Sequence, residues 1–142
     1  MSWVKDVVNN LVTRYKTSDP FELASQRNIH VIEFNLHHEF KGFYKYDKRN
    51  KYIVLNSNLE NFQQKFVCAH ELGHAELHSR LNTPFLRAST LYSSSRVEVE
   101  ANTFAVELLI PDSAISSEYQ STIYEAAAEY GVPKEVVHLK NF

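Results

Sequence analysis

Residues 70–74 read His70-Glu71-Leu72-Gly73-His74, and this stretch decides how the rest of the chain is interpreted. On an α-helix, side chains four positions apart project from the same face, so His70 and His74 can bind one metal ion together. Glu71 is rotated from His70 by about 100°, which directs its carboxylate towards a water molecule at that ion. The HExxH spacing therefore predicts a zinc site in which Glu71 is the general base.

The residues around the motif have the pattern of a long helix. Phe66, Ala69 and Leu77 fall on the same face as the two histidines, and the polar run 56–58 (Asn-Ser-Asn) supplies candidate N-caps. Gly73 weakens a helix by roughly 1 kcal/mol relative to alanine. We therefore expect another element, or the metal site, to approach the helix closely at Gly73.

A hydrolytic zinc site uses three protein ligands and leaves one position open, so the two histidines need a partner. Metzincins place a third histidine six residues after the second, but that position here is Arg80. A glutamate from a later helix is the remaining common solution, which would make the site gluzincin-like. The candidates are Glu98, Glu100 and Glu107, all within residues 96–110, which have helical spacing and stop before a proline.

The helical faces favour Glu98 over Glu100 as the third ligand. Glu98 shares a stripe with Ala101, Asn102 and Ala105, whose small side chains allow close approach to the motif helix. Glu100 falls on a polar stripe with Thr103 and Glu107, and such a stripe is commonly a solvated face. From spacing alone, Glu100 stays open as the alternative. Asn102 is placed to donate or accept a hydrogen bond beside a ligand.

The other histidines lack ligand spacing. His78 continues the four-residue spacing from His74, but a fourth protein ligand would block water activation, so an orienting or packing role is expected. His37 and His38 read as an exposed loop, and no role is assigned to two further histidines, His30 and His138. Residues 80–95 read as a long surface loop that is a candidate lid. Tyr92 within it is a candidate donor to the oxyanion of a tetrahedral intermediate.

The remaining patterns predict an α+β fold. Residues 3–16 read as an amphipathic helix, and Asp19-Pro20 opens a short helix that ends near Arg27. Residues 29–35 read as a strand, and 42–46 with 51–55 as a hairpin around the turn 47–50. Strand 51–55 is a candidate edge for pairing with an extended substrate. Residues 121–130 and 133–140 read as two helices broken at Gly131, with a further short helix from Asp112.

The composition restricts the class of protein. A chain of 142 residues, 44% hydrophobic and 23% charged, fits one globular domain over residues 1–142. A formal charge of −2 gives no general attraction for nucleic acid or anionic membrane. Without a signal-peptide or membrane-spanning pattern, we expect a cytoplasmic protein. The one cysteine, Cys68, suits a reducing compartment and is expected to be a small buried hydrophobe; no oligomeric state is implied.

Nucleic-acid binding has one weak candidate, the helix, glycine turn and helix that residues 126–137 suggest, which faintly resembles a helix-turn-helix motif. The second of these helices carries only two basic residues, Lys134 and Lys140. A plain helical hairpin is the favoured interpretation, and no direct nucleic-acid binding is expected.

Two stretches together resemble the ImmA/IrrE family of metallopeptidases. The first runs from His70 to His78 (HELGHAELH), and the second from Glu98 to Pro111 (EVEANTFAVELLIP). They follow one another at the family's spacing, which makes the resemblance far more specific than HExxH alone. It covers residues 58–111, with a looser match through residues 130–133.

The resemblance implies a zincin-like domain in which a small sheet with a hairpin packs against the HExxH helix and a later helix brings the third ligand. The glutamate that opens the family's Glu-x-x-Ala-Asn run corresponds to Glu98, so the implied zinc ligands are His70, His74 and Glu98, with Glu71 as the catalytic carboxylate. One zinc ion is implied. The implied substrate is a helix-turn-helix repressor of a prophage or mobile element, cleaved to derepress its genes. The alternative is a regulatory module that sequesters a repressor without cutting it.

Overall fold

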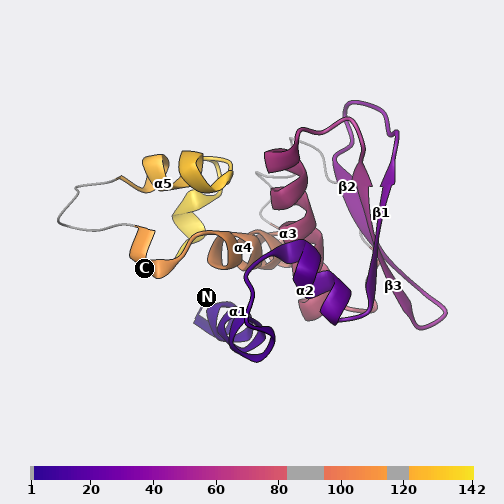
Figure 1. Cartoon of the computed structure of the whole chain (residues 1–142), viewed down its shortest axis with the longest axis horizontal. Helices are drawn as coiled ribbons and strands as arrows, with labels where there is room; N and C mark the ends of the chain where they lie inside the picture. Colours follow the sequence, from indigo (N-terminus) through magenta and orange to yellow (C-terminus); the bar gives the residue numbers. More distant parts are fainter. Residues whose placement is uncertain (1, 83–94, 115–121) are drawn as a thin grey trace.

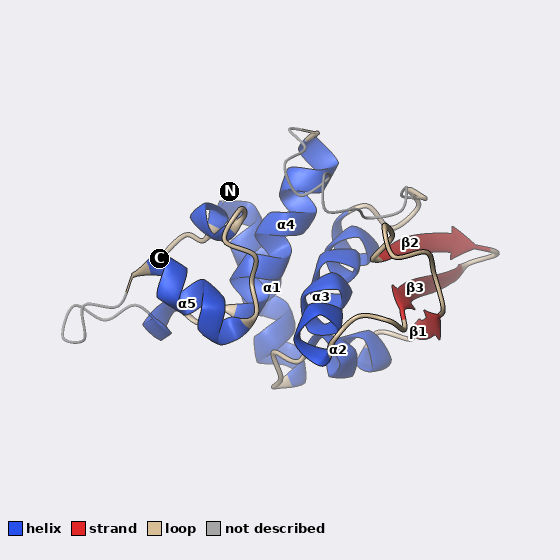
Figure 2. Ribbon diagram, turned by 90° about the horizontal axis from the view of Figure 1, so that it is seen from above, coloured by secondary structure: helices blue, strands red, loops and turns tan. Residues whose placement is uncertain are grey.

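The computed structural model describes residues 2–82, 95–114 and 122–142, which form an α+β fold. Figure 1 shows helix α3 (Asn61–Leu77) between a small β-sheet and a group of helices, and the view in Figure 2 gives the same layers. The other helices are α1 (Ser2–Tyr15), α2 (Pro20–Gln26), α4 (Arg96–Leu109) and α5 (Ile123–Tyr130), with 3-10 turns at Asp112–Ala114 and Val137–Leu139. None of the helices in these ranges is long and apolar enough to cross a membrane.

The sheet contains β1 (Ile29–Phe34), β2 (Gly42–Asp47) and β3 (Asn50–Asn56) in the order β1-β3-β2. The predicted hairpin is confirmed: β2 and β3 are antiparallel and joined by Lys48 and Arg49, both at positive φ, as a two-residue hairpin turn requires. The prediction that β3 is an edge strand is wrong. β1 pairs with it in parallel on the other side, with Ile29 opposite Lys51, so β3 is central and has no free edge.

The two N-terminal helices agree with the sequence prediction. Helix α1 buries Val4, Val8 and Leu11, which recur at helical spacing. Helix α2 begins at Pro20, and the Asp19 side chain caps it by accepting a hydrogen bond from the backbone N–H of Phe21 at 2.9 Å. Helix α2 then lies against β1 and α3 and helps to cover one face of the sheet.

Helix α3 starts later than the sequence suggested. Its N-cap is Glu60, which forms a capping box with Gln63, rather than a residue of the run 56–58. Asn56 instead ends β3, is 1% exposed, and uses its side-chain amide to bind the carbonyls of the loop before β2. It donates to the carbonyls of Leu36, His37 and Phe40 at 3.2, 3.2 and 2.8 Å. The candidate cap therefore stabilises a different part of the chain.

Helices α3 and α4 pack closely, and Gly73 is the reason they can. A Cβ placed on Gly73 would lie 3.0 Å from the Cβ of Phe104 and 3.2 Å from the Cα and carbonyl oxygen of Ala101. The expected close approach of another element at Gly73 is thus confirmed. Helix α4, within one residue of its predicted range at each end, is held against the helix that carries the motif.

The C-terminal region is less helical than predicted. Helix α5 forms and ends at Gly131, whose φ of 72° is the left-handed conformation that closes many helices. The second helix predicted over residues 133–140 is absent; a turn and the 3-10 turn Val137–Leu139 take its place. Lys140 is buried there, with its Nζ 2.7 Å from Glu107 and 2.5 Å from Asp112. The favoured helical hairpin and the helix-turn-helix alternative are therefore both wrong, because the second helix does not form. One of the two basic residues of the alternative, Lys140, is also buried.

Candidate metal centre

The three polar residues of the HExxH motif lie in the buried middle of α3. His70, Glu71 and His74 are 1%, 1% and 0% exposed, and one ligand atom from each lies within 4.8 Å of the others. Charged or polar groups this deeply buried are costly unless they are paired or bind an ion. The spacing predicted from sequence thus produces a compact group of potential ligands inside the protein.

Glu98 reaches this group from the first turn of α4. Its Oε2 lies 3.2 Å from Nε2 of His70, and its Oε1 lies 2.9 Å from Nε2 of His74, so one carboxylate bridges both imidazoles. Burial favours the neutral acid, but the contacts with the two histidines outweigh it and hold the pKa of Glu98 well below its usual range. The structure therefore brings Glu98 to the motif as a charged carboxylate.

Three buried atoms of the centre have no hydrogen-bond partner within the described chain: both carboxylate oxygens of Glu71 and Nε2 of His74. The His74 atom is 2.9 Å from Glu98, so the two are close without the geometry of a hydrogen bond. Lone pairs from an imidazole and a carboxylate that converge in this way suit a shared cation, which would satisfy them. The donor set, two imidazoles and one carboxylate, fits a divalent ion of the zinc type.

Burial also sets the protonation of the two remaining motif groups. Burial raises the pKa of Glu71 to about 8, because it disfavours the charged form of a carboxylate that has no hydrogen-bond partner among the described residues. It lowers the pKa of His74, which favours the neutral imidazole that a metal requires. For His70, burial acts in the same direction, but the nearby carboxylates of Glu98 and Glu71 outweigh it and raise the pKa.

The inner nitrogen of His70 is held by Asn102 of α4. Nδ1 of His70 lies 2.7 Å from Oδ1 of Asn102, and both side chains are 1% exposed. A carbonyl oxygen only accepts hydrogen bonds, so Nδ1 carries a proton, and Nε2, which faces Glu98, is the nitrogen left to bind a metal. The hydrogen bond expected for Asn102 is therefore present, and it keeps His70 in the form that can bind a metal.

The interpretation of Glu100 and Glu107 as a solvated stripe is wrong. Glu100, Thr103 and Glu107 are 5%, 1% and 6% exposed. Glu100 lies 2.8 Å from Nε2 of His78, and Glu107 is paired with Lys140. Helix α4 is buried on more than one side because α1 and the C-terminal 3-10 turn contact it as well as α3, and its own sequence does not reveal these contacts. Glu100 does not reach the motif histidines directly, which leaves Glu98 as the glutamate beside them.

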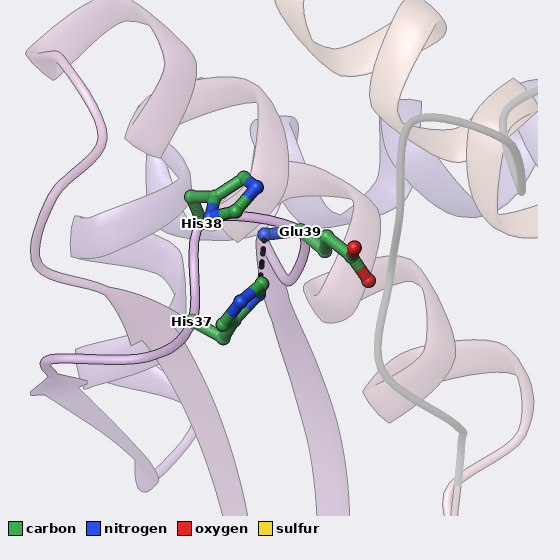
Figure 3. Close-up of side chains that lie close together, drawn as sticks. All are labelled: His37, His38 and Glu39. Carbon is green, nitrogen blue, oxygen red and sulfur yellow. Dashed lines mark hydrogen bonds between the residues drawn. The ribbon is translucent and has the colours of Figure 1, made fainter.

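A second group of potential ligands is exposed on the protein surface. Figure 3 shows His37, His38 and Glu39 in the loop before β2, with the backbone N–H of Glu39 donating to Nδ1 of His37 at 3.3 Å. All three are exposed, as expected for the two histidines, so water is not excluded there.

Two other residues singled out from the sequence are Cys68 and Tyr92. Cys68 is fully buried and forms no disulfide, which confirms its expected packing role. Tyr92 and the candidate lid fall outside the described residues, apart from the ends of that loop.

Comparison with known proteins agrees with this geometry. The sequence profile of the IrrE N-terminal-like domain, a peptidase family, matches residues 24–140. The "Uncharacterized immunity region protein 2" of Bacillus phage phi105 is 58% identical over 141 residues, covering 97% of this chain and 89% of the phage protein. Metallopeptidase ImmA of Bacillus subtilis (strain 168) is 30% identical over 115 residues, covering 80% of this chain and 66% of that protein. The resemblance inferred from the two motifs is confirmed, and the chain belongs to the IrrE N-terminal-like domain family of metallopeptidases.

Proposed function

We propose that this protein is a zinc-dependent endopeptidase that cleaves a helix-turn-helix repressor of a phage or mobile element. One observation carries the proposal: side chains from two helices converge on a buried point where a carboxylate, Glu71, has no hydrogen-bond partner among the described residues. Such an arrangement is costly in a merely structural core. In a metallopeptidase of the HExxH-plus-glutamate, or gluzincin-like, type each of these groups has a task.

His70, His74 and Glu98 are the proposed ligands of one zinc ion. The two imidazoles would bind through Nε2, the atoms that already face the Glu98 carboxylate at 3.2 and 2.9 Å. When bound, zinc supplies a Lewis acid for the peptide carbonyl and lowers the pKa of water towards 7. Three protein ligands leave one position for water or substrate.

Glu71 is the proposed general base. Its carboxylate is buried, has both oxygens free of hydrogen bonds within the described chain, and lies next to the ligand atoms of His70 and His74. It would take a proton from the attacking water and pass it to the leaving amine when the peptide bond breaks. Burial raises the pKa of Glu71 in the metal-free protein, and the positive charge of a bound zinc ion would act in the opposite direction, favouring the carboxylate that a general base requires.

The substrate proposal draws on the relatives. The similar phage protein is named for an immunity region, and the similar bacterial protein is named a metallopeptidase. Phage immunity depends on a repressor that keeps the element silent, so a peptidase of this kind has an obvious protein target. We propose that cleavage falls in a flexible or opened stretch of that repressor, since the centre is buried and a folded domain does not enter it.

Zinc binding is the first test. The exposed His37 and His38 would add weak surface binding, so the titration uses the His37→Ala/His38→Ala variant as the background. We expect one zinc per chain by elemental analysis, and a loss of affinity of at least about 100-fold when Glu98→Gln is added. Zinc binding that is unchanged by Glu98→Gln would contradict the assigned ligand.

Cleavage is the second test. The zinc-loaded protein is incubated with candidate helix-turn-helix repressors, beginning with any that a neighbouring gene encodes, and the fragments are identified by mass spectrometry. We expect discrete fragments with wild type and a loss of rate of about 100-fold or more with Glu71→Gln, which should keep its zinc. An intact repressor that co-purifies with the protein in stable complex would instead favour sequestration and overturn the peptidase proposal.

A further inference from the structure

His74 is connected to helix α4 by a line of hydrogen-bonding groups that the proposed reaction does not use. Its Nδ1 lies 3.1 Å from Nδ1 of His78, and Nε2 of His78 lies 2.8 Å from Oε1 of Glu100. The second oxygen of Glu100 accepts a hydrogen bond from Nε of Arg96 at 3.1 Å. The side chains of His78 and Glu100 are only 10% and 7% exposed, so water competes little for these contacts.

The Glu100 carboxylate at the end of this line decides where the protons on His78 and His74 lie. A carboxylate only accepts hydrogen bonds, so Nε2 of His78 must carry a proton to face Glu100. When His78 is neutral it has one N–H, and its Nδ1 is then an acceptor. The proton between the two Nδ1 atoms then belongs to His74, and Nε2 of His74 keeps its lone pair. That lone pair is on the side where Glu98 and the proposed zinc site lie.

We propose that His78 and Glu100 are positioning residues that hold His74 in the tautomer able to bind zinc through Nε2. This inference rests on the proposed zinc site. His78 follows His74 by four residues, the same spacing that separates His74 from His70. The inference assigns His78 a task other than metal binding. It also assigns a task to Glu100, which is two residues after Glu98 on α4 and contacts His78.

The backbone places His78 for this task. It is the C-cap of α3, with φ −135° and ψ 48°, so the chain leaves the helix at His78 while its N–H still bonds to the carbonyl of His74 at 2.7 Å. The carbonyl of His78 accepts from the N–H of Leu81 at 2.9 Å, which fixes the following turn. The ring is therefore held beside His74, with centroids 5.2 Å apart, instead of extending into solvent.

Both histidine ligands thus receive their orientation from one helix. Asn102 accepts directly from Nδ1 of His70 at 2.7 Å, while Glu100 acts on His74 through His78. Helix α4 supplies the third ligand, Glu98, from the same stretch. Groups that orient metal-binding histidines typically change metal affinity by about 10-fold to 100-fold when they are removed.

The first experiment reads the tautomers in the wild-type protein. Protein labelled with ¹⁵N is loaded with zinc, and imidazole nitrogen shifts are assigned through the ring protons. We expect His74 with its proton on Nδ1 and zinc on Nε2, and neutral His78 with its proton on Nε2. A His78 that carries its proton on Nδ1, or a His74 that binds zinc through Nδ1, would overturn the inference. This measurement needs no variant to fold.

The second experiment measures zinc affinity with a competing chelator. We expect His78→Ala to lose about 10-fold to 100-fold in affinity. His78→Asn, whose Oδ1 stands where Nδ1 was, should recover part of the loss because it restores the acceptor. Glu100→Gln should lose several-fold, because an amide can donate to His78 and permits the wrong tautomer. His138→Ala removes an exposed histidine and should bind zinc as wild type does.

The outcomes separate this inference from the proposed function. If wild type binds no zinc, the proposed peptidase fails, and the positioning role fails with it. If wild type binds zinc but His78→Ala and Glu100→Gln bind equally tightly, only the positioning role is overturned. Circular dichroism and thermal denaturation of the metal-free variants establish that each is folded, so a loss of affinity with no recovery in His78→Asn also counts against the hydrogen bond.

Discussion

Replacing Gly73 with alanine tests whether the contact between α3 and α4 sets the geometry of the metal centre. In an isolated helix this change stabilises by about 1 kcal/mol. Here the new Cβ would lie 3.0 Å from the Cβ of Phe104 and 3.2 Å from the backbone of Ala101, closer than normal contact. Overpacking of this kind costs roughly 1–3 kcal/mol. Because backbone atoms cannot rotate away, the overpacking cost should be at the upper end of this range, and subtracting the helix gain of about 1 kcal/mol leaves an expected net loss of about 1–2 kcal/mol.

The same change should weaken zinc binding, because α4 must move away by a few tenths of an ångström and Glu98 moves with it. Binding groups must be held within about 0.5 Å of their productive geometry, and a shift of a few tenths of an ångström uses up most of that margin, so we expect affinity to fall about threefold to tenfold. Stability is measured by urea denaturation of the metal-free protein, where the free energy of unfolding is compared with wild type. Zinc affinity is measured by chelator competition on the same samples.

Gly131→Ala is the matched control. Gly131 has φ 72°, so alanine is strained there by about 1–2 kcal/mol, but within the described part of the chain its Cβ would meet only Phe62 atoms, at 3.5 and 3.6 Å. We expect a similar loss of stability with unchanged zinc affinity. The reasoning is refuted if Gly73→Ala is more stable than wild type and keeps full affinity, since that is the behaviour of a helix with no close neighbour.

Three further perturbations follow from the buried charges and caps. Metal-free Glu71→Gln should be more stable than wild type at pH 8 by up to about 3–5 kcal/mol and equal to it near pH 4. Burial raises the pKa of Glu71 from the usual 4.5 to about 8 in the folded state, so wild-type stability falls as pH rises between those values; urea denaturation at several pH values checks this. Lys140→Met should cost about 3–5 kcal/mol, because it leaves the buried Glu107 carboxylate without its cation and with only the backbone N–H of Asn141 as a donor, and adding Glu107→Gln should restore much of the unfolding free energy. Asp19→Ala should lower stability by about 1 kcal/mol in a thermal melt, since the N–H of Phe21 loses its cap.

Features fixed by neighbours in sequence were predictable. The spacing of His70 and His74 depends only on helix geometry, and α4 was recognised from its own periodicity. The cap at Asp19 and the β2–β3 hairpin likewise depend on a few adjacent residues. Gly73 indicated a close approach because its cost to a helix needs a compensation, although the sequence did not say which atoms approach.

Features fixed by distant contacts were not predictable. Whether β3 is central depends on β1 pairing beside it, and nothing within β3 records that partner. The helix predicted over residues 133–140 does not form, and Lys140 is instead buried against Glu107. Local helix propensity cannot anticipate such a tertiary contact. Polar residues of α4 looked solvent-facing because charge pattern alone cannot distinguish water from a buried partner.

The sequence by itself determined the spacing of His70 and His74 on α3, the order of the main elements and the family. Only the tertiary structure decided that Glu98 lies against both histidines while Glu100 lies against His78. These two glutamates are two residues apart on one helix, so they project in different directions, and their different partners depend on the angle and separation at which α4 crosses α3. That crossing is set by side-chain packing over the whole contact, which no local stretch of sequence contains.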